Sequence, residues 1–195
     1  MKFLYYIKAI LLTCFLSSFS NLSFAIDAER YVIDSTHSSV EFSIRHFVAK
    51  TNGNFSTFEG FIDIDTNDPT KNYTEAQISI KSVNTNSTKR DAHLQEADYF
   101  NSSSNPLIEF KSTNWAKNQA NDTFLVEGIL TMNGVSKTVT LDVTLLGLGE
   151  GFNGQKLSGW EGTTTLNRTD WNILGGLGAV GEMVDIRINL EAYKK

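Results

Sequence analysis

The residues best suited to binding chemistry gather between positions 88 and 110, where the strand-like pattern of the chain is interrupted. Thr88 is expected to cap a short helix at the start of this stretch. Arg90, His93 and Leu94 recur at three- and four-residue spacings, so we expect them to share one face of that helix. A guanidinium, an imidazole and an aliphatic side chain on one face suit the mouth of a cavity better than a plain core.

The polar residues of this region have two open roles. Arg90 could contact a polar or charged headgroup, or it could pair with Asp91 or Asp98 and fix the helix on the rest of the fold. His46 lies on the apolar face of its segment, either as a hydrogen-bonded core residue or as a second imidazole near His93 at the cavity mouth.

Other kinds of chemistry find less support in the sequence. Arg168 and Asp170 are expected to form a structural pair at a strand end, and His37 is expected to act in a turn or as a cap. The three histidines and the carboxylates could hold a metal, but the sequence has no His-Glu-x-x-His pattern. It also has no Gly-x-Ser-x-Gly elbow and no glycine-rich phosphate loop, so hydrolase chemistry is disfavoured.

The elements that must position these residues are strands, because most of the chain alternates between apolar and polar residues. Val40, Phe42, Ile44 and His46 share one face of the first clear segment, for example. Asn133-Gly134 predicts a hairpin with a primed turn. Eight segments show this alternation: 39–47, 58–65, 76–82, 107–112, 124–132, 139–145, 160–166 and 184–192.

Strands that are apolar on one face need that face covered, and a chain with so little helix must cover it with more sheet. A barrel or a sandwich would satisfy this requirement. We predict an all-β fold, an eight-stranded antiparallel, lipocalin-like barrel with a short helical excursion. Gly60, Gly128 and Gly162 fall on the apolar faces, where they could be bend points and leave room for a cavity.

Residues 1–25 are expected to be a secretory signal peptide, and residues 26–195 a single domain. Lys2 and Lys8 precede an apolar run, and Ser23-Phe24-Ala25 offers a cleavage site. The apolar run is too short to favour a membrane-spanning helix. Cleavage would remove both lysines and Cys14, the only cysteine, so the net charge would move from -5 to -7. Such an acidic chain is not expected to bind nucleic acid.

The sequence resembles the family of YceI-like polyisoprenoid-binding proteins in five ordered motifs over nearly the whole mature chain. These motifs lie at residues 34–46, 55–60, 79–94, 128–135 and 166–171. The resemblance implies a lipocalin-like barrel, secretion to the bacterial periplasm, and an isoprenoid lipid or similar amphiphile bound inside the barrel without a covalent cofactor.

We therefore expect a non-enzymatic carrier of a polyprenyl or quinone-type lipid. Two alternatives remain: a stress-associated structural barrel with an incidental ligand, which could act as a homodimer, and a protein that binds metal or does chemistry through its histidines. The expected ligand-binding residues are Phe42, Ile44, His46, Phe58, Ile62, Arg90, His93, Leu94, Phe100, Phe110, Leu130, Leu141, Trp160, Leu166, Trp171 and Ile186.

Overall fold

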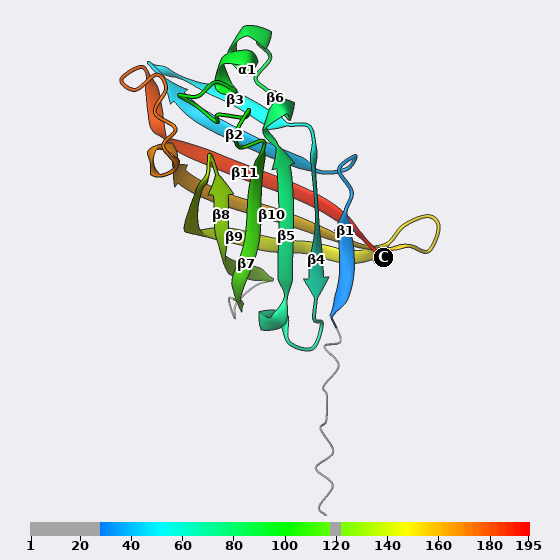
Figure 1. Cartoon of the computed structure of the whole chain (residues 1–195). Helices are drawn as coiled ribbons and strands as arrows, with labels where there is room; N and C mark the ends of the chain where they lie inside the picture. The colour runs from blue at the N-terminus through cyan, green and yellow to red at the C-terminus, as the bar shows by residue number, and fades with distance from the viewer. Residues whose placement is uncertain (1–27, 118–121) are drawn as a thin grey trace, which may run out of the picture.

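The computed structural model describes residues 28–117 and 122–195, and its strands form one sheet that curls round on itself (Figure 1). The predicted signal peptide, with Cys14, lies outside the described residues. The strands are β1 (Glu29–Ile33), β2 (Ser39–His46), β3 (Ala49–Phe55), β4 (Phe58–Ile64), β5 (Tyr73–Ser79), β6 (Val83–Asn84), β7 (Leu107–Lys117), β8 (Thr123–Met132), β9 (Val135–Glu150), β10 (Lys156–Asn167) and β11 (Val180–Lys194). The helical elements are α1 (Thr88–Leu94) and the 3-10 turns η1 (Pro69–Lys71), η2 (Ile80–Ser82) and η3 (Arg168–Trp171).

The sheet closes because β11 pairs with β1 as well as with β10. The order β1-β4-β5-β7-β8-β9-β10-β11 therefore returns to its start, and neighbouring strands within it pair antiparallel. β2, β3 and β6 extend the wall beyond β1 and β4, with β2 pairing along β11 from Val180 to Asn189. The predicted eight-stranded antiparallel barrel with a short helix is confirmed.

The structure adds three strands that the alternation did not predict: β1, β3 and the two-residue β6. β3 has few apolar residues, and its place is fixed by backbone pairing with β2, in which Ile44 lies opposite Thr51 and Val40 opposite Phe55. β1 does alternate, with Tyr31 and Ile33 buried, but it is only five residues long. A pattern that short is hard to separate from a loop.

The hairpin between β8 and β9 has the turn that its sequence predicts. Asn133 and Gly134 both have positive φ, 48° and 73°, as a primed turn requires. Met132 lies directly opposite Val135, so the turn sets the register of the whole hairpin.

The apolar core consists of two clusters, one under α1 and one toward the other end of the barrel. Ile80, which is fully buried, belongs to the first cluster. The second is built on aromatic rings: Trp115 meets Trp160 edge to face at 5.7 Å and Phe124 at 5.5 Å. The two clusters fill opposite parts of the barrel interior. The size of the space between them depends on how closely the side chains of each cluster pack.

The inward-facing glycines have different roles. A Cβ at Gly128 would overlap the Phe110 ring and lie 2.7 Å from the Lys111 carbonyl oxygen, so this glycine accommodates a close neighbour. Gly60 likewise faces the backbone of β5. At Gly162 the nearest atom, Cβ of Ile188, is 3.7 Å away, which is ordinary contact. Only Gly162 therefore leaves room inside the barrel as the sequence predicts.

Gly128→Ala and Gly162→Ala form a matched pair that tests this packing. We expect Gly128→Ala to lower the free energy of unfolding by about 1 to 3 kcal/mol, because the new methyl overpacks the wall. Gly162→Ala should stay within about 0.5 kcal/mol of the wild type. Urea denaturation of both variants measures the difference, and equal losses would contradict the assigned roles.

Candidate functional site

The barrel encloses a cavity of about 320 Å³ between the inner faces of its strands and the segment that contains α1. Fifteen of the sixteen predicted residues line it: Phe42, Ile44, His46, Phe58, Ile62, Arg90, His93, Leu94, Phe100, Phe110, Leu130, Leu141, Trp160, Leu166 and Ile186. Their role in ligand binding stays a prediction, but the strands bring them together around one space.

Several inward-facing side chains keep part of their surface accessible because that space is not filled. Phe42, Ile44, Leu166 and Ile186 all line the cavity and are only partly buried. In a filled core, such aliphatic and aromatic side chains would lose nearly all of their accessible surface. The accessible apolar surface therefore faces the cavity.

Trp171 is the exception, and its prediction as a lining residue needs correction. It is 2% exposed and belongs to the core cluster under α1. Its indole nitrogen donates a hydrogen bond to the Leu130 carbonyl oxygen at 3.2 Å, and its own carbonyl oxygen accepts one from Asn133 at 3.0 Å. The left-handed residue Asn172, with φ 58°, ends η3 directly after it and turns the chain. This local geometry sets the ring against β8.

Helix α1 begins one residue earlier than its predicted cap implies. Ser87, not Thr88, is the N-cap, and its hydroxyl accepts a hydrogen bond from the Arg90 backbone N–H at 3.5 Å. Asp91 accepts hydrogen bonds from the backbone N–H and the hydroxyl of Thr85, at 2.8 and 2.5 Å. The helix is thus tied to the end of β6 through a side chain, and the tie holds the helical face over the cavity.

Arg90 does not form the predicted pair with Asp91 or Asp98. Its Nε donates to the Thr85 hydroxyl at 2.7 Å, and Nη2 donates to the Thr85 carbonyl oxygen at 2.6 Å. Thr85 is 3% exposed, so the guanidinium is held by a buried residue while it lines the cavity. The remaining N–H groups of the guanidinium stay available to donate hydrogen bonds to another acceptor.

His46 and His93 mark the place where the cavity reaches the surface, because both line it and both are exposed. The His93 ring meets that of Tyr99 edge to face at 4.9 Å, and its Nε2 lies 3.7 Å from an Asp98 carboxylate oxygen. The His46 ring packs against that of Phe47 at 4.8 Å. Polar groups therefore border the opening, while apolar groups line the depth.

Arg168 also lines the cavity, and the predicted pair with Asp170 is wrong. Its side chain donates instead to three carbonyl oxygens: Gly181 at 2.8 Å, Ile173 at 2.7 Å and Val180 at 3.3 Å. Burial of the guanidinium, which is 4% exposed, lowers its pKa from the ordinary value. The residue fastens the loop that follows η3 to the start of β11.

Some of the lining residues that were not predicted could have been identified from the sequence pattern, whereas others could not. Val184, Ile188 and Leu190 share the inner face of β11 with Ile186, so alternation alone identifies them. Residues in loops or held by tertiary contacts have no comparable pattern. The lining residues of this second kind include Thr85, Tyr99, Arg168 and Ile173.

Comparison with known proteins shows the family to which this barrel belongs. A model of the YceI-like domain family matches residues 31–192. This chain belongs to that family. Protein YceI of Escherichia coli O6:H1 is 34% identical over 191 residues, which cover 96% of this chain and 98% of that protein. A UPF0312 protein of Serratia proteamaculans is 35% identical over 170 residues, which cover 86% of this chain and 88% of that protein.

Solved structures agree on the fold of this YceI-like barrel. The YCEI protein of Campylobacter jejuni has a TM-score of 0.68 at 28% identity, over 77% of this chain and 90% of its own. BcnA of Burkholderia cenocepacia has a TM-score of 0.75 at 21% identity, over 82% and 99%. A polyisoprenoid binding domain from Saccharophagus degradans has a TM-score of 0.63 at 16% identity, over 85% and 98%. None of the helices in the described part of this family member is long and apolar enough to cross a membrane.

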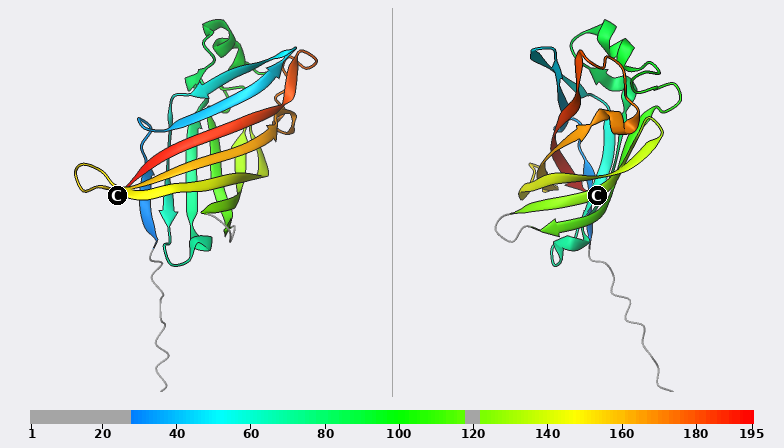
Figure 2. Two further views of the ribbon diagram at one scale, coloured as in Figure 1. Left: turned by 180° about the vertical axis from the view of Figure 1, so that it is seen from behind. Right: turned by 90° about the vertical axis from the view of Figure 1, so that its left-hand side faces the viewer.

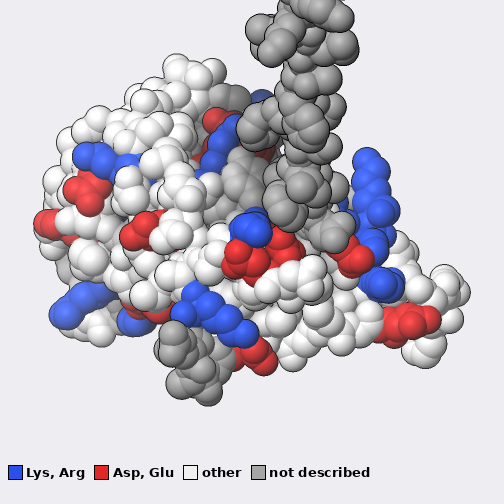
Figure 3. Space-filling view, turned by 90° about the horizontal axis from the view of Figure 1, so that it is seen from below, with Lys and Arg blue, Asp and Glu red and all other residues white. Residues whose placement is uncertain are grey.

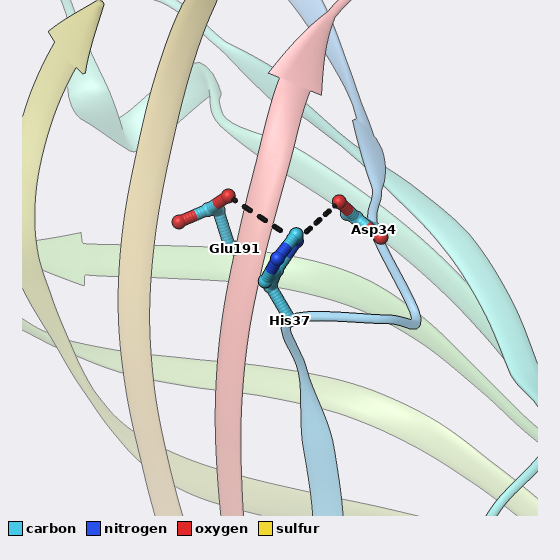
Figure 4. A group of neighbouring side chains, drawn as sticks. All are labelled: Asp34, His37 and Glu191. Atoms are coloured by element: carbon cyan, nitrogen blue, oxygen red, sulfur yellow. Dashed lines mark hydrogen bonds and ion pairs between the residues drawn. The ribbon is translucent and has the colours of Figure 1, made fainter. Parts of the chain in front are cut away.

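A second cluster lies outside the cavity of the YceI-like barrel, where Asp34, His37 and Glu191 converge (Figure 4). The His37 Nδ1 is 2.8 Å from an Asp34 carboxylate oxygen and 3.8 Å from one of Glu191. Each residue offers one metal-ligating atom, and the three atoms lie within 4.8 Å of one another. Within residues 28–117 and 122–195 this is the one such group, and the cavity-lining histidines are not part of it.

The cluster fastens the turn between β1 and β2 to β11. The Glu191 backbone N–H donates to the Ser38 hydroxyl at 3.0 Å, and Asp34 donates its backbone N–H to the Glu191 carbonyl oxygen at 2.9 Å. The hydrogen bond to Asp34, with the charges of Asp34 and Glu191, raises the pKa of His37. The same bond, with one from the Thr36 backbone, lowers the pKa of Asp34. His37 thus acts in a turn, as its sequence position suggests.

His37→Gln should show the pH dependence that these shifts imply. Stabilisation from charged His37 is complete below its ordinary pKa of 6.5 and is lost as the pH rises through the raised folded value. Stabilisation from charged Asp34 is complete above its ordinary pKa of 3.8. It is lost as the pH falls through the lowered pKa of the folded state. The Tm difference between wild type and variant should therefore be larger at about pH 5.5 than at about pH 8.5. Differential scanning fluorimetry at both pH values measures it, and a pH-independent difference would contradict the ionic role.

Proposed function

We propose that this chain is a non-enzymatic periplasmic carrier that holds a polyisoprenoid or similar amphiphilic lipid, of quinone or polyprenyl type, inside the barrel. The observation that carries this proposal is the cavity of about 320 Å³, with apolar depth and polar groups at its opening. Membership of the YceI-like family and the likeness to a polyisoprenoid binding domain support it. Ligand pockets commonly begin at about 300 Å³, so the cavity suits part of a lipid tail.

The apolar lining can supply the affinity without covalent or metal help. Burial of one methylene contributes about 0.8 kcal/mol, so one five-carbon isoprene unit contributes roughly 3 to 4 kcal/mol at most. Three or four units would exceed the roughly 8 kcal/mol that micromolar binding needs, even after the cost of association. A tail of this length can therefore be held by apolar contact alone.

The opening of the cavity provides hydrogen-bond donors for a headgroup. Arg90 and His93 of α1 and His46 at the end of β2 border it, and all three are exposed. Quinone oxygens or a pyrophosphate would accept hydrogen bonds from these groups. The lipid would then lie with its tail toward the aromatic cluster of Trp115 and Trp160 and its headgroup at the opening.

Secretion would bring the barrel to a compartment in which a lipid tail needs to be enclosed. A signal peptide at residues 1–25 would deliver the domain to the periplasm, an aqueous compartment between two membranes. A prenyl tail exposed to water there would aggregate or stay in a bilayer. Enclosing the tail would let a single lipid molecule cross that space.

One specific observation favours a second function, metal binding at Asp34, His37 and Glu191. One imidazole and two carboxylates are a ligand set that suits several divalent transition metals. Elemental analysis of the purified protein tests this directly. Stoichiometric metal that is lost in His37→Ala would favour the metal function over the carrier.

A homodimer remains a prediction for the outer surface of the sheet. Leu125 and Ile129 of β8 are 49% and 37% exposed, on the face that points away from the cavity. Light scattering coupled to size exclusion gives the number of chains per particle.

The carrier proposal predicts a lipid in the purified protein and its loss when the cavity is filled. Organic extraction and mass spectrometry should recover a prenyl lipid at a substantial molar fraction from the wild type. Gly162→Phe places a ring inside the barrel, where a Cβ meets only ordinary contacts, and should lower that fraction several-fold. Thr163→Phe places the same ring on the outer, exposed face of β10 and serves as the control. A clean wild-type extract that also resists loading with quinones would overturn the proposal.

Arg90→Ala should weaken retention of lipids with a polar headgroup more than retention of plain hydrocarbons of the same length. Loss of a charge-assisted hydrogen bond lowers affinity about tenfold or more, while the apolar lining is unchanged. Lys89→Ala, which removes a neighbouring cation that does not line the cavity, is the control. Competition binding with both ligand types measures the ratio. Equal weakening of both would mean that Arg90 acts only through its bonds to Thr85.

A further inference from the structure

Four large apolar side chains stand exposed on two loops beside the cavity opening, and we refer to them as the apolar rim. Phe47 and Val48 form the tip of the hairpin between β2 and β3, and they are 61% and 95% exposed. Leu174 and Leu177 lie in the loop between η3 and β11, and they are 49% and 51% exposed. Single exposed apolar residues are common on proteins, but four in adjacent loops form a patch.

The two loops are joined to each other and to the cavity. The Phe47 backbone N–H donates to the Ala179 carbonyl oxygen at 2.9 Å, and His46 lies opposite Val180 in the ladder between β2 and β11. His46 and Val180 both line the cavity. The β2–β3 tip and the loop before β11 lie side by side at the end of the barrel that carries α1 in both Figure 1 and the left view of Figure 2. The rim therefore borders the opening through which a ligand must pass.

The backbone conformation of Phe47 is one that bulky residues rarely adopt, so its exposed ring is unusual in a second respect. Phe47 has φ 48°, in the left-handed region that Gly and Asn occupy at low cost and that bulky residues rarely adopt. An Asn or Gly would satisfy this turn with less strain and without placing an aromatic ring in water. Folding alone therefore does not account for a phenyl ring at this position.

One loop of the rim carries no charge, while at the other the Arg45 Nε donates to the Phe47 carbonyl oxygen at 2.8 Å. Residues 171–181 contain no ionisable side chain, although the chain carries a formal net charge of -5. Figure 3 shows the opposite end of the barrel, where acidic and basic side chains of both signs are interspersed. Exposed apolar side chains with a single arginine beside them, on an acidic protein, are complementary to a zwitterionic lipid surface, on which net electrostatic attraction is not needed.

The size of the rim argues against a second copy of this chain as its occupant. The four side chains expose on the order of 400 Å², about half of the roughly 800 Å² that each partner of a stable protein interface buries. Insertion of a few side chains into the boundary between headgroups and acyl chains needs no such area, because each buried apolar group contributes directly.

We propose that the apolar rim docks on the surface of a lipid bilayer and turns the cavity opening toward the membrane. Phe47 and Val48 insert among the lipid headgroups together with Leu174 and Leu177. The docked orientation gives a tail a dry path between the bilayer and the barrel interior. This inference adds a membrane contact to the proposed carrier function, and the docking itself does not require that a lipid be bound.

Vesicle co-sedimentation tests the docking. The probe is phosphatidylcholine vesicles, and the protein is expressed from the full chain and purified as it is secreted. The double variant Phe47→Asn, Val48→Ser suits the left-handed turn and removes two apolar side chains, so it should fold. The control is Leu148→Ser, Phe152→Ser, which removes side chains that are 51% and 112% exposed in and after β9, away from the rim. Thermal melting confirms that both variants fold.

We expect the wild type to partition onto the vesicles and the rim variant to partition at least tenfold more weakly, with the control within about twofold of the wild type. Addition of salt should leave wild-type partitioning unchanged, because charge does not drive it. Absence of wild-type binding, or equal loss in the control, would overturn the proposal. So would a rim variant that alters only the number of chains per particle, since the rim would then be a contact between copies. Extraction of lipid from the same samples separates the two ideas: vesicle binding by a protein that yields no lipid and resists loading with quinones would overturn the carrier function and leave the docking intact.

Discussion

Closure of the sheet by the pairing of β1 with β11 is the constraint on which the rest of the structure depends. Ile33 lies opposite Ala192 and Tyr31 opposite Lys194, so the first and last described strands meet. Without these backbone hydrogen bonds β1 and the last residues of β11 would have open edges, and the apolar inner faces beside them would be exposed to water. β11 also pairs with β10 and β2, so this strand links both parts of the wall. The turn cluster of His37 fastens the same region from outside.

The two ends of the barrel are closed by different chemistry, which gives the interior a direction. Trp115 and Trp160 pack edge to face in one cluster, and each is 2% exposed. Their indole N–H groups find no hydrogen-bond partner among the described residues, so this end offers a ligand ring faces and two uncharged donors. At the other end the bonds between Arg90 and Thr85 hold α1 over the opening. An amphiphile inside would be oriented by this difference alone.

Alternation in the sequence predicted most of the wall, because a side-chain period of two is a property of the local backbone. The inner faces of β2, β8 and β11 follow from it, and with them most of the cavity lining. β3 lacked the pattern, since Thr51 and Gly53 hold their places through pairing with β2. The roles of Arg168 and Trp171 could not be predicted. Both depend on how η3 ends at left-handed Asn172 and on which carbonyl oxygens then come within reach.

The unfilled interior is itself an argument about function. A space of this size is costly, because the side chains around it lose packing contacts that a filled core would give them. Whole domains are stable by only about 5 to 15 kcal/mol, so filling the space would be a simple route to a more stable protein. Larger side chains at Gly162 or Ala76, both on the lining, would begin to do so. A barrel that keeps the space open instead is less stable than a filled one. A ligand that binds the folded state and not the unfolded state restores stability.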